Sequence, residues 1–298
     1  MGITGACDSP AGSASPSQQM RVAVDALAAS RQVDQTTSFD PSRETLRRMA
    51  SVDRYNRWIY NRIEPHVGRR VLEVGCGLGN MTPFFFGRDL LVSLDLLPAS
   101  VEHVRQKYGG QPSFLVIRGD ICDESVVGEL KPHSFDTVAC LNVLEHIYDD
   151  GRALRHMREL VQPGGKLILF VPAGSYLYGH LDIALAHHRR YEMGSLASMV
   201  QTAGLRIDSI GYMNVWGIPG WFLASRILRS KTPPRGLLRL YNLLAPILIR
   251  VEEATRPPFG QSILCIAERA DGDTSSAGGV HQPQAKLVAS LPAWTQDT

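Results

Sequence analysis

Glycines and acidic residues that follow two apolar runs are the first feature of this sequence whose spacing suggests chemistry. The runs cover residues 70–74 and 90–95, and the residues of interest are Glu73, Gly75, Gly77, Gly79 and Asp95. Glycine lets a backbone approach a ligand closely, and a helix that starts after such a turn offers oriented N–H groups. We therefore expect residues 71–79 to bind a nucleotide-like ligand and to lead into an apolar helix.

The spacing of these glycines excludes two common phosphate-binding motifs. A dinucleotide-binding G-x-G-x-x-G turn needs a glycine where this chain has Asn80, and its third glycine, Gly79, comes one position too early. No Gly-Lys-Ser or Gly-Lys-Thr follows, so a P-loop is absent from the sequence. A nicotinamide-dependent dehydrogenase is therefore disfavoured.

The elements that must position these residues alternate between short apolar runs and helical spacing. Strands are expected at residues 70–74, 90–95, 114–118, 135–141, 166–171, 206–213 and 262–267. Helical spacing covers residues 43–63, 98–108 and 150–161. This alternation predicts an α/β fold with a Rossmann-like, seven-stranded, mostly parallel sheet and helices on both faces. Residues 216–261 predict a helical insertion between the last two strands, with two helices separated by residues 232–236.

The pattern Glu73-x-Gly-x-Gly-x-Gly79 resembles motif I of class I S-adenosylmethionine-dependent methyltransferases. Four further motifs follow in order: Leu94-Asp95-Leu96, Arg118-Gly119-Asp120-Ile121, Phe135-Asp136-Thr137-Val138 with Asn142 after it, and Leu160-Val161-Gln162-Pro163-Gly164-Gly165. The resemblance covers about residues 55–269 and implies S-adenosylmethionine as the cofactor.

The resemblance also implies a role for each residue that matches a motif. Asp95 would accept bonds from the ribose hydroxyls, and Asp120 would meet the adenine amino group. Leu96 and Ile121 would enclose the adenine, Asn142 would lie under the methionine part, and Glu73 would serve the amino-acid end. The remaining cofactor-binding residues are Gly75, Cys76, Gly77 and Gly79.

A second resemblance concerns the acceptor. Residues 177–191 read LYGHLDIALAHHRRY, similar to a Gly-His-Tyr-Arg-Arg-Tyr run in a bacterial subgroup of these enzymes, from which the chain departs at Ala186 and His188. A histidine can remove a proton from an acceptor near neutral pH. We expect His187 to be that base, with His146 and His180 as alternatives. The expected substrate contacts are Tyr176, His188, Arg190, Tyr191 and Trp216.

Several residues have a structural alternative to a functional role. Tyr55 and Trp58 are equally consistent with core packing and with a cover over the cofactor. Glu145 is equally consistent with an acceptor contact and with a helix start, whereas Asp136 is expected to be structural. We expect no metal site, because His187 and His188 are adjacent and lack a third ligand.

Composition and charge limit the remaining possibilities. The chain has 298 residues, with 31 Lys and Arg against 29 Asp and Glu, so bulk charge does not favour nucleic-acid binding. The five cysteines form no C-x-x-C pair, which favours reduced thiols. No signal pattern or long apolar run is present, so we expect a cytoplasmic protein. The expected organisation is a leader (1–40, with a short helix near 20–29), a methyltransferase domain (41–269) and a tail (270–298).

These observations predict transfer of a methyl group to an oxygen or nitrogen of a small, apolar or lipid-linked metabolite, such as a natural product, a sugar or a quinone-like compound. The alternative is a cofactor-binding protein of the same fold with a non-methylating or scaffold role. Leucines and arginines in residues 237–251 suggest peripheral contact with a membrane or a second copy of the chain, or simply an extra layer of the domain.

Overall fold

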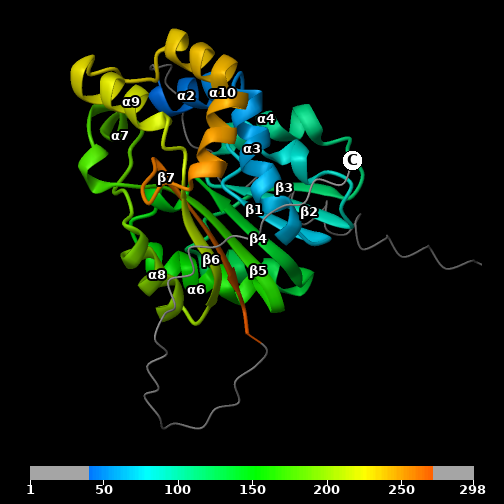
Figure 1. Cartoon of the computed structure of the whole chain (residues 1–298). Coiled ribbons are helices and arrows are strands. Elements are labelled where there is room, and N and C mark those ends of the chain that lie inside the picture. Colours follow the sequence, from blue (N-terminus) through cyan, green and yellow to red (C-terminus); the bar gives the residue numbers. More distant parts are fainter. Residues whose placement is uncertain (1–39, 271–298) are drawn as a thin grey trace, which may run out of the picture. The chain divides into compact units, whose positions relative to one another are not determined.

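The computed structural model describes residues 40–270, which form an α/β fold around one seven-stranded sheet (Figure 1). The strand order is β3-β2-β1-β4-β5-β7-β6, and β7 runs antiparallel to both of its neighbours. The strands are β1 (Arg70–Val74), β2 (Leu90–Asp95), β3 (Phe114–Arg118), β4 (Phe135–Leu141), β5 (Val161–Pro172), β6 (Arg206–Met213) and β7 (Ser262–Glu268). The predicted fold class is confirmed.

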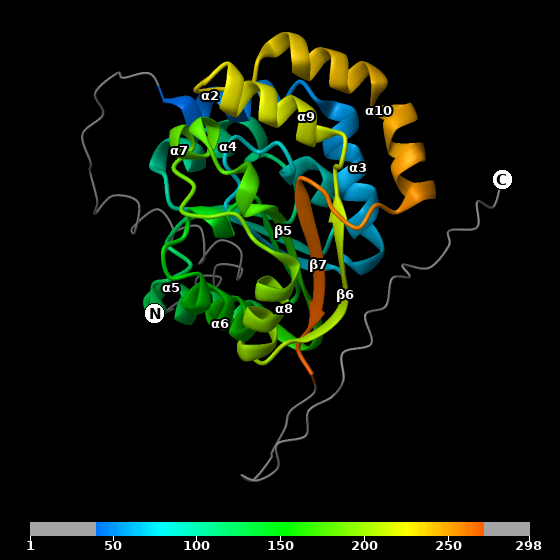
Figure 2. The same ribbon diagram turned by 60° about the vertical axis from the view of Figure 1, so that its left-hand side comes forward.

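Helices cover both faces of the sheet (Figures 1 and 2). Apolar residues of α3, α4 and α10 pack on one face with Val71 and Phe170, and residues of α5, α6 and α8 pack on the other with Leu72 and Leu169. Side chains alternate between the faces because successive strand residues point in opposite directions. The α-helices are α2 (Pro41–Met49), α3 (Asp53–Ile63), α4 (Pro98–Tyr108), α5 (Glu124–Leu130), α6 (Asp150–Leu160), α7 (His180–Ala184), α8 (Met193–Thr202), α9 (Gly217–Phe222) and α10 (Arg235–Thr255).

The chain ends lie outside this description. The predicted leader up to residue 39, its short helix near residues 20–29, and the predicted tail from residue 271 fall outside the described residues. The division into leader, domain and tail therefore stays a prediction.

The helical spacing at residues 43–63 is divided between two helices. The chain leaves α2 after Met49, and α3 begins at Asp53. The hydroxyl of Ser51 donates to the carbonyl of Arg48, which closes the end of α2. The break allows α2 to lie at the glycine turn while α3 packs on the sheet.

The prediction of an apolar helix after the glycine turn is wrong. Residues Thr82–Phe85 form only a single 3₁₀ turn, η2, with a proline at its second position. Gly87 follows with φ at +80°, a left-handed conformation that an α-helix cannot continue through. No α-helix follows the glycine turn directly, so no helix dipole adds to the positive potential of its N–H groups.

The insertion between β6 and β7 contains α9, a π-helical turn η6 (Leu223–Ile227) and the long helix α10, so the predicted helical insertion is confirmed. Pro233 and Pro234 precede α10, close to the predicted break. The inner face of α10 packs against α3 through Leu238, Tyr241 and Ile249. Pro246 lies within α10 and has no N–H for the carbonyl of Asn242, which accepts a bond from Arg54 instead (3.3 Å).

Candidate active site

The turn after β1 holds three glycines in the left-handed region. Gly75, Gly77 and Gly79 have φ values of +76°, +54° and +73°. A Cβ atom on Gly77 would lie 3.0 Å from Cδ1 of Leu46, and the carbonyl of Leu46 accepts a bond from the side chain of Asn80 (2.8 Å). Helix α2 therefore covers the turn, and a side chain at Gly77 would meet it.

Asp95 at the end of β2 is tied to this turn. Its Oδ2 accepts a bond from the backbone nitrogen of Gly77 (2.7 Å), and its Oδ1 accepts one from Leu97 (2.9 Å). The carboxylate is 8% exposed, and burial raises its pKa above the usual value. The two predicted cofactor-binding elements are thus joined directly at the carboxyl edge of the sheet.

The other predicted nucleoside contacts follow β2 and β3 at the same edge. Leu96 is 56% exposed and Ile121 is buried. Asp120 is exposed, and one of its oxygens accepts a bond from the backbone nitrogen of Cys122 (2.8 Å). Parallel β2 and β3 pair Asp95 with Arg118, so both acids stand at strand ends that are neighbours. Ligands bind at this edge in open α/β sheets.

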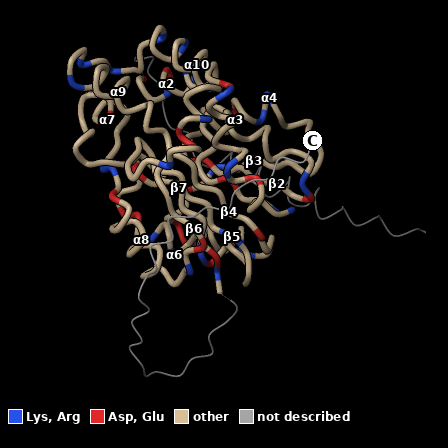
Figure 3. The backbone as a smooth tube through the Cα atoms, in the orientation of Figure 1, with Lys and Arg blue, Asp and Glu red and all other residues tan. Residues whose placement is uncertain are grey.

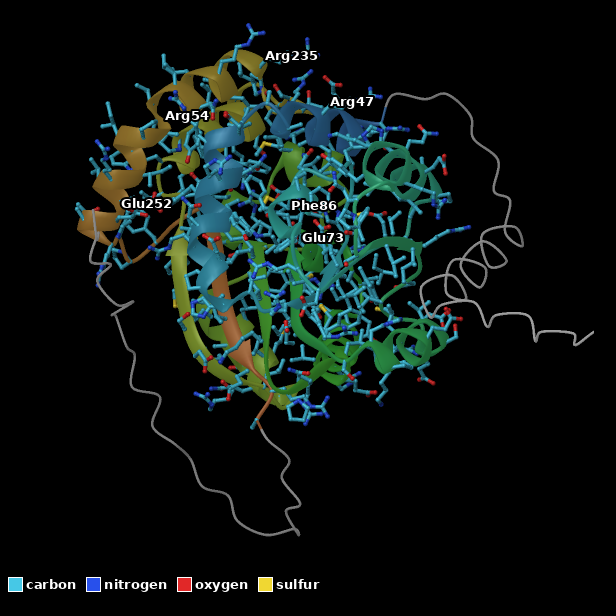
Figure 4. The ribbon with its side chains drawn as sticks, turned by 90° about the vertical axis from the view of Figure 1, so that its right-hand side faces the viewer. Arg47, Arg54, Glu73, Phe86, Arg235 and Glu252 are labelled. Carbon is cyan, nitrogen blue, oxygen red and sulfur yellow. The ribbon has the colours of Figure 1, made fainter. Side chains whose placement is uncertain are left out.

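Glu73, on β1 just before the glycine turn, lies inside the protein (Figure 4). Its Oε2 accepts bonds from the hydroxyls of Thr82 (2.7 Å) and Ser93 (2.6 Å). Burial raises the pKa of Glu73 to about 7, although these hydroxyls favour the ionised form. A carboxyl group with this pKa would become a carboxylate beside a positively charged group such as an ammonium.

Two further predicted contacts are Asn142 and Cys76. Asn142, after β4, has φ at +55°, and its backbone nitrogen donates to the carbonyl of Phe170 (2.7 Å). Cys76 is buried, and its backbone nitrogen donates to the carbonyl of Leu94. Asp136 lies at the opposite end of β4 and accepts bonds from the backbone nitrogens of Arg69 and Arg70, so its expected structural role is supported.

The predicted acceptor side is organised around His187 and Asp182. Nδ1 of His187 lies 2.9 Å from Oδ1 of Asp182, and both side chains are buried. Burial acts to raise the pKa of Asp182, but the bond to His187 and the charge of Arg190 outweigh it, so the pKa is lowered. Because an ionised carboxylate only accepts, Nδ1 carries a proton, and in the neutral ring the free lone pair is on Nε2.

Glu145 and His146 are neighbours of the His187 ring. Oε1 of Glu145 lies 4.0 Å from Nε2 of His187, and the rings of His146 and His187 have centroids 4.7 Å apart. Burial raises the pKa of Glu145 to about 7, while desolvation and then His187 lower the pKa of His146 to about 4. Oε2 of Glu145 is buried and has no hydrogen-bond partner among residues 40–270.

The remaining predicted acceptor residues fall into two groups. Tyr176 and Trp216 are 59% and 41% exposed, and the side chains of His180 and His188 are also exposed. Arg190 and Tyr191 are buried: Arg190 binds Asp182 (2.8 Å), and the Tyr191 hydroxyl lies 2.9 Å from Oδ2 of Asp150. These contacts suit positioning roles for Arg190 and Tyr191 rather than direct contact with an acceptor.

Tyr55 and Trp58 belong to the core. Both are buried on α3, and the indole nitrogen of Trp58 donates to Glu253 (3.3 Å).

The residue that covers the glycine turn is Leu46 of α2, which sequence reasoning missed. It also missed Asp182, whose sequence signal was a single acid within the basic run at residues 177–191.

Three side chains that were not predicted as a metal site come together here. Glu145, His146 and His187 offer possible ligand atoms within 4.8 Å of one another. The expectation of no metal rested on the adjacent pair His187 and His188. His188 is not part of this cluster, and both Glu145 and His146 come from the segment after β4.

Comparisons with known proteins agree with this architecture. Residues 72–169 match the family profile described as "Methyltransferase domain". The ubiquinone biosynthesis O-methyltransferase of Xanthomonas euvesicatoria is 30% identical over 163 residues, which cover 49% of this chain and 66% of that protein. The mitochondrial ubiquinone biosynthesis O-methyltransferase of Schizosaccharomyces pombe is 32% identical over 122 residues, covering 41% and 44%. The chain thus spans less than two thirds of the length of these relatives.

A solved structure supports the fold. The complex between the Haloferax volcanii Trm112 methyltransferase activator and a candidate methyltransferase contains a chain that matches with a TM-score of 0.55 and 15% identity, covering 80% of this chain and 100% of that one. At that identity the match concerns the fold alone. Together, the sheet order, the glycine turn and the profile match show that this chain contains a methyltransferase domain with the fold of class I S-adenosylmethionine-dependent methyltransferases.

Proposed function

We propose that this protein transfers the methyl group of S-adenosylmethionine to a hydroxyl oxygen of a small, apolar, quinone-like acceptor. The observation that carries the proposal is the tie between Asp95 and Gly77 at one end of the site, combined with a histidine held by a buried carboxylate at the other. The quinone-like class is supported by the relatives named for ubiquinone biosynthesis and by the exposed aromatic residues Tyr176 and Trp216.

The residues present suit the cofactor. The left-handed glycine turn presents backbone N–H groups, Asp95 supplies oxygens for ribose hydroxyls, and exposed Leu96 offers an apolar surface for a purine. When bound, the cofactor supplies an electrophilic methyl group on a sulfonium. Glu73 would balance the positive charge at the amino-acid end, directly or through water.

The chain's own contribution to the reaction is alignment and proton removal. Nε2 of His187 would accept the proton of the acceptor hydroxyl, so that the oxygen could take up the methyl group that the bound cofactor would supply. Asp182 holds the ring and stabilises its positive charge. A base of this kind contributes roughly 10²–10⁴-fold in rate, and holding the reactants in line contributes several kcal/mol more.

The test is a reaction with purified full-length protein and cofactor carrying a labelled methyl group. Hydroxylated aromatic rings with an apolar tail serve as acceptors beside an extract of the host, and the products are identified by mass. A labelled methyl ether supports the proposal. Cofactor binding measured by calorimetry, without transfer to any acceptor or extract component, would favour the non-methylating alternative.

A further inference from the structure

The outer face of α10 carries an exposed apolar stripe. Its residues recur at helical spacing and are Leu240 (53% exposed), Leu243 (68%), Leu244 (39%), Ile247 (63%) and Val251 (40%). They span about 16 Å along the helix axis at 1.5 Å per residue. Since the inner face of α10 already packs on α3, this stripe is a second apolar face without a partner among the described residues.

The charge around the stripe is mostly positive. From residue 209 to residue 251 the sequence contains no Asp or Glu, and its basic residues are Arg226, Arg229, Lys231, Arg235, Arg239 and Arg250. Figure 3 shows blue positions along α9 and α10 at the end of the protein opposite α6 and α8. The whole chain is nearly balanced at +2, so this segment differs sharply from the rest.

A groove of about 770 Å³ adjoins the stripe at Leu243, between α10, α2 and α3. It is lined by five arginines and only two acids, and Arg47, Arg54 and Arg235 lie around it in Figure 4. Both acids already have partners: Glu44 accepts bonds from Arg48 and Arg235, and Asp53 accepts one from Asn242. The groove therefore keeps an excess of positive charge.

We propose that this face of α10, with the arginine groove beside it, docks the protein on the surface of a bilayer that contains anionic phospholipids. The stripe enters the boundary between headgroups and acyl chains, and the arginines meet lipid phosphates. No helix among residues 40–270 is long and apolar enough to span a bilayer, so the contact is a surface contact.

The charge pattern favours a bilayer over a second copy of the chain. A two-fold dimer through this face would bring the same patch against itself, so Arg239 and Arg250 would face like charges. The two acids of α10 already have partners: Glu252 accepts bonds from the backbone nitrogens of Asn214 and Val215, and Glu253 accepts one from Trp58. An anionic bilayer supplies both an apolar interior and the opposite charge. This inference does not depend on methyl transfer.

The test is co-sedimentation of the full-length protein with vesicles of phosphatidylglycerol and phosphatidylcholine in equal parts. We expect binding that falls with added salt and is much weaker on pure phosphatidylcholine. Each neutralised arginine should weaken the partition coefficient about fivefold, so R239Q/R250Q should weaken it roughly 25-fold. L243Q/I247Q should also bind more weakly, at unchanged net charge.

Matched controls keep the result interpretable. Arg155 is exposed on α6, which packs on the opposite face of the sheet, so R155Q should bind vesicles as the unchanged protein does. All variants concern exposed side chains and should keep their melting temperature. The proposal fails if the protein does not bind mixed vesicles, or if R239Q/R250Q bind as strongly as R155Q. It also fails if sedimentation shows a dimer that L243Q/I247Q separates while vesicles bind nothing.

Discussion

The carboxylate of Asp95 accepts a 2.7 Å hydrogen bond from the backbone nitrogen of Gly77, which links the end of β2 to the turn after β1. One acid thereby serves two purposes, since it fixes the glycine turn and presents oxygens at the edge where a nucleoside would lie. The turn and the acid are 18 positions apart in sequence, and the parallel pairing of β1 and β2 brings them together.

Replacement of Asp95 by Asn should weaken cofactor binding. A hydrogen bond to a charged group is worth about 1.5–3 kcal/mol, which corresponds to roughly 10- to 100-fold in affinity. Calorimetry with S-adenosylmethionine and with its demethylated product measures the change, and Asp120→Asn provides a comparison at the neighbouring strand end. An unchanged dissociation constant for D95N, in a protein with an unchanged melting temperature, would contradict the assignment of Asp95.

The raised pKa of Glu73 predicts that the free energy of unfolding depends on pH. Burial raises its pKa in the folded protein to about 7 from an ordinary 4.5, so the folded state holds a proton that the unfolded state releases. This contribution is complete below pH 4.5 and is lost as the pH rises to about 7. E73Q lacks the titration, so its free energy of unfolding relative to the unchanged protein should rise by about 3 kcal/mol across that range. Urea unfolding at several pH values measures the difference, and a flat difference would refute the prediction.

Substitution of His187 should affect catalysis alone, whereas substitution of Asp182 should affect both catalysis and stability. H187Q should lower kcat about 100-fold or more and leave the cofactor dissociation constant unchanged, because it removes the base. D182N should lower kcat too, and it should also lower the free energy of unfolding by about 3 kcal/mol, because it leaves the buried charge of Arg190 without its partner.

The cofactor dissociation constant and the melting temperature separate these effects from general misfolding. If His187 is the base, H187Q should keep both values while kcat falls, whereas D182N should lower the melting temperature as well. His180→Gln is the control, because His180 is exposed at the start of α7. Full activity of H187Q at saturating cofactor would show that another group, or none, takes the proton.

The strands were predictable because their signals are local. Residues 70–74, 90–95 and 114–118 are short apolar runs with clear ends, and the structure places strands at those same positions. The prediction of a helix after the glycine turn failed for a local reason as well: the backbone is extended at Phe86 and left-handed at Gly87, so only one 3₁₀ turn forms. The spacing of apolar residues alone could not predict where this helix ends.

The side-chain partners in the candidate site depend on tertiary structure and were not predictable. Asp182 reaches His187 because residues 178–191 fold back on themselves, with the Tyr178 hydroxyl donating to the His187 carbonyl and the His188 nitrogen donating to the Glu145 carbonyl. Leu46 reaches Gly77 only because the chain breaks between α2 and α3. Periodicity within one segment carries no information on such contacts.

Chelation tests whether the cluster of Glu145, His146 and His187 acts as a base or holds a metal ion. The three possible ligand atoms lie within 4.8 Å of one another, and His146, with its pKa lowered to about 4, is neutral and able to ligate near pH 7. In the proposed mechanism Nε2 of His187 must stay free for the acceptor proton, so dialysis against EDTA should leave kcat unchanged. Loss of activity on dialysis, with recovery on adding Mg²⁺ or Zn²⁺, would replace the base with a bound ion that lowers the pKa of the acceptor hydroxyl.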